Sequence, residues 1–264
     1  MEPMLWTEGV IRILAGLTVF DLVFAAGVLL LGGLLKGTVG FAVGLVAVAG
    51  LVQLFPPKVA VVALTIPFFF SNVAVLVRDG VPWDFVRGQV PFVTMLVVGL
   101  FVGVAGLEAL PPRGVYLLLA VYIGGFLIFQ RYEAAIERYA ASSVAGPVAG
   151  TLAGVLGGAV SAPGPPLIIH AYISADNDRV VFVTGASTLF LIAHIVRVIF
   201  LVDATLLGPA EVWLGVLFTF PVFAGVMLGA HYRSSIDPLT FKRLTLALLA
   251  VIGLKLAADG LGML

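Results

Sequence analysis

The stretch GAVSAPGPPLIIHAY, residues 158–172, places three prolines, two glycines and a histidine inside a long apolar region. Proline removes a backbone donor and collides with the preceding helical turn, and glycine weakens a helix by about 1 kcal/mol relative to alanine. We therefore expect one helix to end and another to begin between Ser161 and Pro166. This break decides the fold, because the sequence on both sides of it is apolar enough for helices that cross a membrane.

The composition around the break is that of an integral membrane protein. The 264 residues are 61% hydrophobic and 11% charged, with a mean hydropathy of +1.19, whereas a soluble domain is about 45–50% apolar and about 25% charged. The formal net charge is zero, so no overall field indicates a nucleic-acid partner. Cysteine is absent, which excludes disulfides and thiolate metal sites. We expect a multi-pass protein that is embedded in the lipid bilayer.

Six apolar runs meet, or nearly meet, the roughly 20 residues that a helix needs to cross the hydrocarbon core. Each run is bounded by charged residues or proline: Val59–Val77, Val86–Leu107, Val115–Phe129, Val180–Val202, Val212–Ala230 and Leu244–Ala258. Two further regions, Ile13–Phe55 and Val144–Ile173, are interrupted by glycine or proline, and each predicts two helical pieces that meet at a break. The sequence leaves open whether these pieces cross fully or re-enter.

The two broken regions belong to an internal repeat. Shifting the chain by about 121 residues places LLKGTVGFAVGLVA, residues 34–47, on VLGGAVSAPGPPLI, residues 155–168. The sequence predicts an all-α polytopic fold of two membrane repeats, residues 1–130 and 144–264, joined by a polar linker at residues 131–143. Each repeat is expected to hold a broken or re-entrant helical hairpin and three transmembrane helices, roughly eight to ten helical segments in all. Basic residues gather on one side if the repeats are inverted, with both termini outside, as the positive-inside rule requires.

The breaks are candidate anion sites. A broken helix has a new N-terminus, whose unpaired N–H groups and dipole attract negative charge. Irregular backbone inside a membrane must be buried in protein or line a cavity, and paired discontinuous helices indicate a transporter's binding site. The alternative is that glycine and proline serve only close packing and kinks. The backbone candidates are Gly37, Thr38 and Gly40 in the first break and Ser161, Ala162, Pro163 and Gly164 in the second.

Two polar side chains of the run Val180–Val202 are further candidates. Arg197 lies well inside the run, and an arginine at the bilayer centre costs about 2.5–3.5 kcal/mol on insertion scales. It therefore requires a partner, either a carboxylate such as Asp203 or a bound anion. His194 lies three residues earlier on the same helical face. It is a hydrogen-bonded packing residue, a substrate contact or a proton relay.

The first half of the chain supplies three more candidate side chains. Lys36 lies at the first break, where its ammonium either meets an anion or reaches to the nearest interface. Asn72 is the counterpart of His194 in the repeat and can donate from its amide, and Ser71 lies beside it. His170, which follows the prolines, is expected to be a packing residue.

The chain contains no enzyme or metal motif. The patterns HExxH, GxSxG and GxxxxGK[ST] are absent, and no span holds a pair of Asp or Glu residues that could bind a metal or act as acid and base. We therefore predict a protein that is not an enzyme and that binds no metal or cofactor.

The first broken region and its second copy carry a resemblance to a known family. LLKGTVGFAVGLVAVAGLVQLFPPKVAVVALTIPFFFSN, residues 34–72, followed by GVLGGAVSAPGPPLIIHAY, residues 154–172, resembles the sulfite exporter TauE/SafE family of membrane permeases. The resemblance covers Phe20 to about Leu256. It implies secondary transport of small anions, such as sulfite or organosulfonates that include sulfoacetate and taurine-like compounds. It also implies a multi-pass protein of a bacterial or archaeal inner membrane.

Two expectations concern the mechanism of transport. The halves should rock about the breaks to give alternating access, and protons should drive transport with His194 as the carrier. A passive anion channel on the same scaffold is the alternative. The oligomeric state stays open, with a homodimer among the options.

Overall fold

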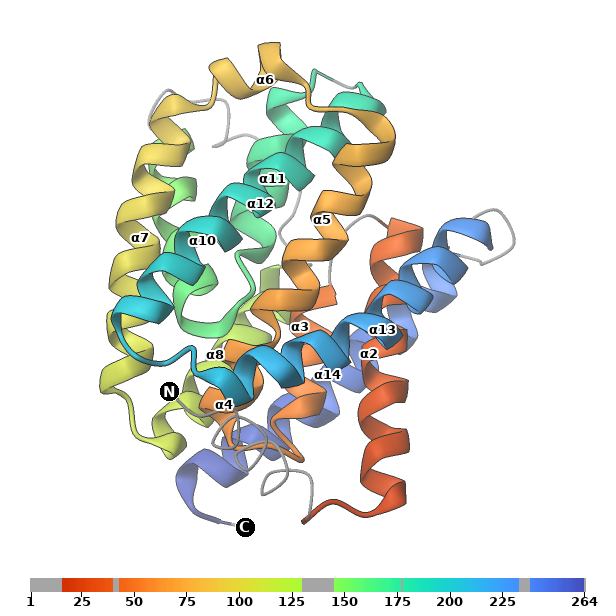
Figure 1. Ribbon diagram of the computed structural model, residues 1–264, viewed down its shortest axis with the longest axis vertical. Coiled ribbons are helices and arrows are strands. Elements are labelled where there is room, and N and C mark those ends of the chain that lie inside the picture. The colour runs from red at the N-terminus through yellow and green to blue at the C-terminus, as the bar shows by residue number, and fades with distance from the viewer. Residues whose placement is uncertain (1–15, 40–42, 130–144, 177, 233–237, 264) are drawn as a thin grey trace.

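The computed structural model describes residues 16–39, 43–129, 145–176, 178–232 and 238–263 (Figure 1). All regular secondary structure in these ranges is helical, which confirms the all-α prediction. The helices are α2 (Val19–Val39), α3 (Val43–Leu51), α4 (Pro57–Ala63), α5 (Thr65–Asp79), α6 (Trp83–Arg87), α7 (Val90–Ala109), α8 (Pro112–Phe129), α10 (Ala145–Val160), α11 (Gly164–Ser174), α12 (Arg179–Asp203), α13 (Pro209–His231) and α14 (Pro238–Leu261).

Within the described ranges, five helical stretches are long and apolar enough to cross a membrane: α2, α4 with α5, α7, α12 and α13. Helices α8 and α10 are shorter apolar helices. Large apolar side chains such as Phe101, Ile199 and Phe220 stay exposed on the outside of the bundle. An apolar outer surface on long apolar helices confirms a multi-pass membrane protein.

Hydropathy did not predict two local features. Helix α6 is short and places Phe85 against Gly185 of α12. The span Pro57–Asp79 is interrupted at Leu64, although hydrogen bonds from Leu64 N and Phe68 N keep its backbone continuous. The interruption lies one turn before Pro67, which lacks the N–H that would bond to the carbonyl four residues earlier.

The second long region is broken where its prolines predict, with three residues between the end of α10 at Val160 and the start of α11 at Gly164. Ser161, which follows the last residue of α10, has φ 61°, in the left-handed region that ends a helix. Gly164, the first residue of α11, has φ 48°.

In the first region, α2 continues through Gly32, Gly33, Lys36 and Gly37, so the interruption expected at these residues is wrong, because glycine weakens a helix without ending it when its neighbours continue the hydrogen bonding. Residues 40–42 of the first break, including Gly40, lie outside the described residues.

Glycines bring two pairs of helices into backbone contact. A Cβ added to Gly99 of α7 or to Gly154 of α10 would lie 2.4 or 2.3 Å from a carbonyl oxygen of the other helix. In the same way, a Cβ added to Gly33 of α2 or to Gly225 of α13 would lie 2.2 or 2.1 Å from a carbonyl oxygen of the other helix. Small residues allow this close packing of membrane helices. Helix α10 of the second half therefore packs on α7 of the first half, and α2 of the first half packs on α13 of the second.

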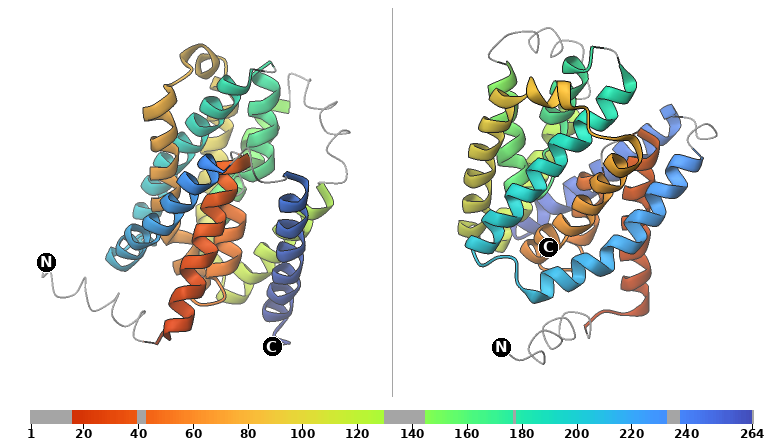
Figure 2. Two further views of the ribbon diagram at one scale, coloured as in Figure 1. Left: turned by 90° about the vertical axis from the view of Figure 1, so that its right-hand side faces the viewer. Right: turned by 45° about the horizontal axis from the view of Figure 1, so that its top comes forward.

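Helices that the predicted repeat would make equivalent also pack together, and they run antiparallel. Helices α14 and α8 lie side by side (Figure 2), with Gly253 against Ile123 and the later Gly260 against the earlier Leu117. Helices α5 and α12 also run in opposite directions, because α5 ends near α6 and α12 begins there (Figure 1). A two-fold axis in the membrane plane produces such antiparallel pairs, which supports the prediction of an inverted repeat.

Candidate functional site

The second break meets the start of α3 inside the bundle. A Cβ added to Gly44 would lie 3.1 Å from Ala162 Cβ and 3.5 Å from the Ser161 carbonyl oxygen. Helices α5 and α12 cross beside this contact and supply most of the buried polar groups. We call the set of these side chains the cationic site: Lys36, Thr65, Ser71, Asn72, Ser161, His194 and Arg197.

Lys36 points into the bundle from the last turn of α2, with only 7% of its surface exposed. Its ammonium donates to Ser71 Oγ at 2.8 Å and to Asn72 Oδ1 at 2.7 Å. Ser71 Oγ and Asn72 Nδ2 both donate to the Phe68 carbonyl oxygen. Their oxygens therefore face Lys36 as acceptors, and the Asn72 amide, which we expected to donate toward an anion, is already engaged. Lys36 does not reach to an interface, the alternative left open by the sequence.

Arg197 is 1% exposed and holds the second break in place. Its Nε and Nη2 donate to the Gly158 carbonyl oxygen at 3.2 and 3.1 Å, and its Nη1 donates to Ser161 Oγ at 3.2 Å and to Thr65 Oγ1. Gly158 lies in the last turn of α10, where carbonyl groups lack a helical partner and a cation is favoured. The Arg197 side chain, which comes from α12, therefore caps the C-terminal end of α10.

Asp203, the carboxylate that we considered as a partner for Arg197, is not bonded to it. Asp203 lies exposed at the end of α12. Six residues of helix separate the two positions, which places them about 9 Å apart along the axis and on different faces. The partners of Arg197 are neutral oxygens from three other segments.

Thr65 is a site residue that sequence reasoning missed. It is fully buried at the start of α5 and accepts from Arg197 across 132 residues of sequence. A signal was available, because Thr65 lies seven residues before Asn72 and this spacing puts both on one helical face.

His194 is a buried residue of α12, three residues before Arg197. It is 2% exposed, its ring centroid is 5.9 Å from that of Phe68, and it is within electrostatic range of both Arg197 and Lys36. Its Nδ1 has no hydrogen-bond partner among the described residues. A buried polar atom without a partner is rare in proteins.

The N-terminus of α11 offers fewer backbone N–H donors than a helix N-terminus without prolines. Helix α11 begins at Gly164, and no side chain caps it. Pro165 and Pro166 carry no N–H, so only Gly164 and Leu167 keep a donor among the first four residues. The Tyr122 hydroxyl donates to the Ala162 carbonyl oxygen at 2.9 Å. The cations of the site are therefore a stronger attraction for an anion than the α11 amides.

Replacing Gly164 with alanine is expected to lower the melting temperature by about 5–10 °C. The new Cβ would lie 2.1 Å from the Tyr122 hydroxyl oxygen, at a φ of 48° that alanine disfavours. Thermal unfolding of the purified protein measures the change. Gly164→Ala should cost less in a Tyr122→Phe background, where the hydroxyl is absent. An equal cost in both backgrounds would exclude this contact as the cause.

The remaining backbone candidates of the first break face away from the cationic site. A Cβ added to Gly37 would lie 2.3 Å from the Val226 carbonyl oxygen, so this glycine packs α2 on α13. The Thr38 hydroxyl donates to the carbonyl oxygens of Leu34 and Leu35 within its own helix. His170 stacks on Phe92 with ring centroids 4.3 Å apart, in agreement with the packing role expected for it.

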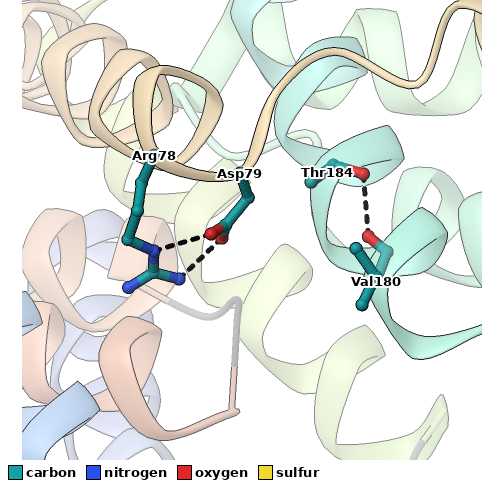
Figure 3. Close-up of polar contacts among 4 residues, drawn as sticks. All are labelled: Arg78, Asp79, Val180 and Thr184. Atoms are coloured by element: carbon teal, nitrogen blue, oxygen red, sulfur yellow. Dashed lines mark hydrogen bonds and ion pairs between the residues drawn. The ribbon is translucent and has the colours of Figure 1, made fainter.

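Ion pairs in the described part of the chain leave both cations of the site without a carboxylate. Figure 3 shows Arg78 bonded to Asp79 through Nε at 2.8 Å and Nη2 at 2.6 Å, near the Thr184–Val180 hydrogen bond of α12. The other described ion pairs join Arg87 to Asp84 and Lys255 to Asp259. Lys36 and Arg197 thus bring two positive side chains into the bundle with neutral partners only.

A bundle of apolar helices with a broken segment and buried polar groups is typical of polytopic membrane proteins of the transporter class. The sequence profile described as "Sulfite exporter TauE/SafE" matches residues 24–256, and the chain belongs to this family. The match confirms the resemblance of residues 34–72 and 154–172, and the family implies a membrane transporter of sulfur anions such as sulfite. Comparisons with curated proteins and with solved structures give no match.

Proposed function

We propose that the chain is a secondary transporter that binds its anion between Lys36 and Arg197 in an inner membrane. The observation that carries this proposal is the burial of both cations without an ion pair to any described carboxylate. Removing a charge from water costs several kcal/mol even after the protein relaxes. A bound anion would offset that cost for both groups. Sulfite, sulfoacetate and taurine-like sulfonates are the proposed substrates, in line with the family.

Alternating access is proposed to arise from motion at the breaks. The Gly44–Ala162 contact joins the first half to the second break, and Arg197 joins that break to α5 and α12. An anion that draws Lys36 away from Ser71 and Asn72 would change how α2 is held against α5. Protons are the proposed coupling ion, with His194 as carrier, because its buried Nδ1 has no hydrogen-bond partner among the described residues.

A thermal-shift screen of detergent-purified protein tests the binding step. A ligand at about 100 times its Kd stabilises the folded state by about 2.7 kcal/mol, a rise in melting temperature of roughly 5–10 °C. Sulfite or a short sulfonate should give this rise, and short carboxylates and chloride should give less. If no anion in the screen raises the melting temperature, the proposed site is wrong.

Flux measurements in liposomes separate the transporter from a passive channel. A transporter gives saturable uptake and counterflow of labelled substrate, whereas a channel gives unitary current steps. Collapsing the pH gradient should stop concentrative uptake if protons drive it. Concentrative uptake that persists without the pH gradient would show that protons do not drive transport, and it would not contradict the proposal that the protein transports an anion.

A further inference from the structure

Helix packing divides the described helices into two groups, and neither group is a half of the chain. We call α6, α7, α10, α11 and α12 the α7 body, and α2, α3, α4, α5, α8, α13 and α14 the α2 body (Figure 1). The α7 body takes its first two helices from the first half of the chain and its last three from the second. Among the described helices, α5 and α12 make the one extensive helix–helix contact between the bodies.

Each body has its own hydrophobic core. The smaller core lies entirely in the α7 body and takes buried residues from all five of its helices, among them Phe85, Leu96, Ala153, Leu167 and Leu189. The larger core takes buried residues from all seven helices of the α2 body, and the ends of α7, α10 and α12 pack on it. Because a close-packed core transmits strain, the helices that share a core should move as a unit.

Backbone contacts between helices also lie within the bodies. The glycines described above join α7 to α10 inside the α7 body and α2 to α13 inside the α2 body. Gly215 of α13 makes a third contact of this kind, since an added Cβ would lie 2.6 Å from the Ala63 carbonyl oxygen of α4. Helices in backbone contact have no flexible side chains between them, so a change of rotamer cannot let them slide.

Side chains carry the contact between α5 and α12. The Arg197 guanidinium of α12 donates to Thr65 Oγ1 at the start of α5. The His194 ring of α12 packs on the Phe68 ring of α5, with their centroids 5.9 Å apart. Small sliding of packed helices is accommodated by side chains that exchange partners. The contact between the bodies can therefore shift more easily than the contacts inside them.

The chain segments that connect the two bodies have residues suited to hinges. Gly80, between α5 and α6, has φ 83°, and a Cβ added there meets nothing within 4 Å. Thr205, between α12 and α13, has φ 55°. Leu110 and Pro111 connect α7 to α8. Domain motions are absorbed by a few residues of this kind at the ends of helices.

We propose that transport moves the α7 body against the α2 body across the α5–α12 contact. Rocking of one half of the chain against the other, which the repeat led us to expect, would have to separate α7 from α10 and α2 from α13. Motion of the two bodies keeps both of these pairs intact. This inference rests on the proposed function, since it specifies the moving parts of the transporter.

A disulfide that joins the two halves of the chain inside one body tests the inference. The chain has no cysteine, so a pair can be introduced alone. A Cβ added to Gly253 of α14 would lie 3.5 Å from Ile123 Cβ of α8, a separation that a disulfide can bridge. Oxidation of the Ile123→Cys/Gly253→Cys variant should change sulfite uptake into liposomes by less than twofold, relative to the same variant kept reduced. A tenfold loss on oxidation would overturn the inference.

Two further measurements complete this test. Leu117→Cys/Gly260→Cys joins the same two helices and replaces the first pair if that variant folds poorly, since a Cβ added to Gly260 would lie 2.6 Å from Leu117 Cγ. The wild-type protein, treated with the same oxidant, is the control. Absence of sulfite uptake by the untreated wild-type protein would instead count against the proposed function.

Distances between spin labels test the motion itself. Labels at Val98→Cys of α7 and Leu152→Cys of α10 share a body but not a half of the chain, whereas labels at Val98→Cys and Phe20→Cys of α2 share a half but not a body. All three side chains are exposed. Sulfite should change the distance between positions 98 and 20 and leave the distance between positions 98 and 152 unchanged. A change between positions 98 and 152, or a constant distance between positions 98 and 20 while sulfite is bound, would overturn the inference.

Discussion

Replacing Arg197 with methionine is expected to raise the Kd for sulfite by roughly 30-fold or more. Truncating one member of a buried charge pair costs about 2–5 kcal/mol of binding free energy. Arg197 is the less exposed of the two cations, and its Nη1 and Nη2 groups lie where the second break meets α5 and α12. Calorimetric titration of the purified wild-type and variant proteins with sulfite measures the rise in Kd. An unchanged Kd would remove Arg197 from the binding site.

The Arg197→Met variant should still insert and fold, because two effects on stability oppose each other. The variant loses hydrogen bonds from a charged donor, worth about 1.5–3 kcal/mol each. The variant also no longer has to bury that charge, and this stabilises it by several kcal/mol. Arg197→Lys separates the two roles, since it keeps the charge but cannot reach Gly158, Ser161 and Thr65 together. We expect Arg197→Lys to bind sulfite with an intermediate Kd.

Replacing Gly99 with valine is expected to destabilise the protein by about 3 kcal/mol or more. The added Cβ would lie 2.4 Å from the Thr151 carbonyl oxygen and 2.9 Å from Gly154 Cα, so α7 and α10 would be forced apart. These atoms are backbone and cannot move aside as a side chain would. The melting temperature should fall by roughly 6–12 °C, measured by thermal unfolding in detergent.

Gly106→Val is the matched control for this prediction. Gly106 lies two turns further along the same helix, and a Cβ added there meets nothing within 4 Å. The substitution should change the melting temperature little. A similar fall in both variants would mean that helix propensity is responsible and that the α7–α10 contact is not.

The sequence predicted the broken helices well because their signals are local. Pro163, Pro165 and Pro166 end α10 and begin α11 through the geometry of their own residues. The apolar runs predicted α7, α12 and α13 to within a few residues of their observed ends. Helix α6 was not predicted because it is too short to produce a hydropathy signal. The interruption at Leu64 was not predicted because the missing N–H of Pro67 affects the helix one turn before the proline itself.

The sequence identified most of the polar side chains that the structure buries in the cationic site, because each is a polar residue in an apolar span: Lys36, Ser71, Asn72, Ser161, His194 and Arg197. That these side chains bind an anion stays a prediction. Gly37 packs α2 on α13, and the Thr38 hydroxyl donates within α2. The capping of Gly158 by Arg197 and the part played by Thr65 could not be predicted, because these contacts join segments far apart in the chain.

The sequence by itself determined that this protein lies in a membrane, that a helix breaks between Ser161 and Pro166, and that few polar groups enter the apolar spans. Hydropathy and the backbone restrictions of proline and glycine are properties of single residues and their neighbours, so they can be read along the chain. Only the tertiary structure decided which neutral oxygens surround Lys36 and Arg197. Those partners depend on how α2, α5, α10 and α12 pack against one another. Close packing of helices is decided by contacts between residues that are remote in sequence.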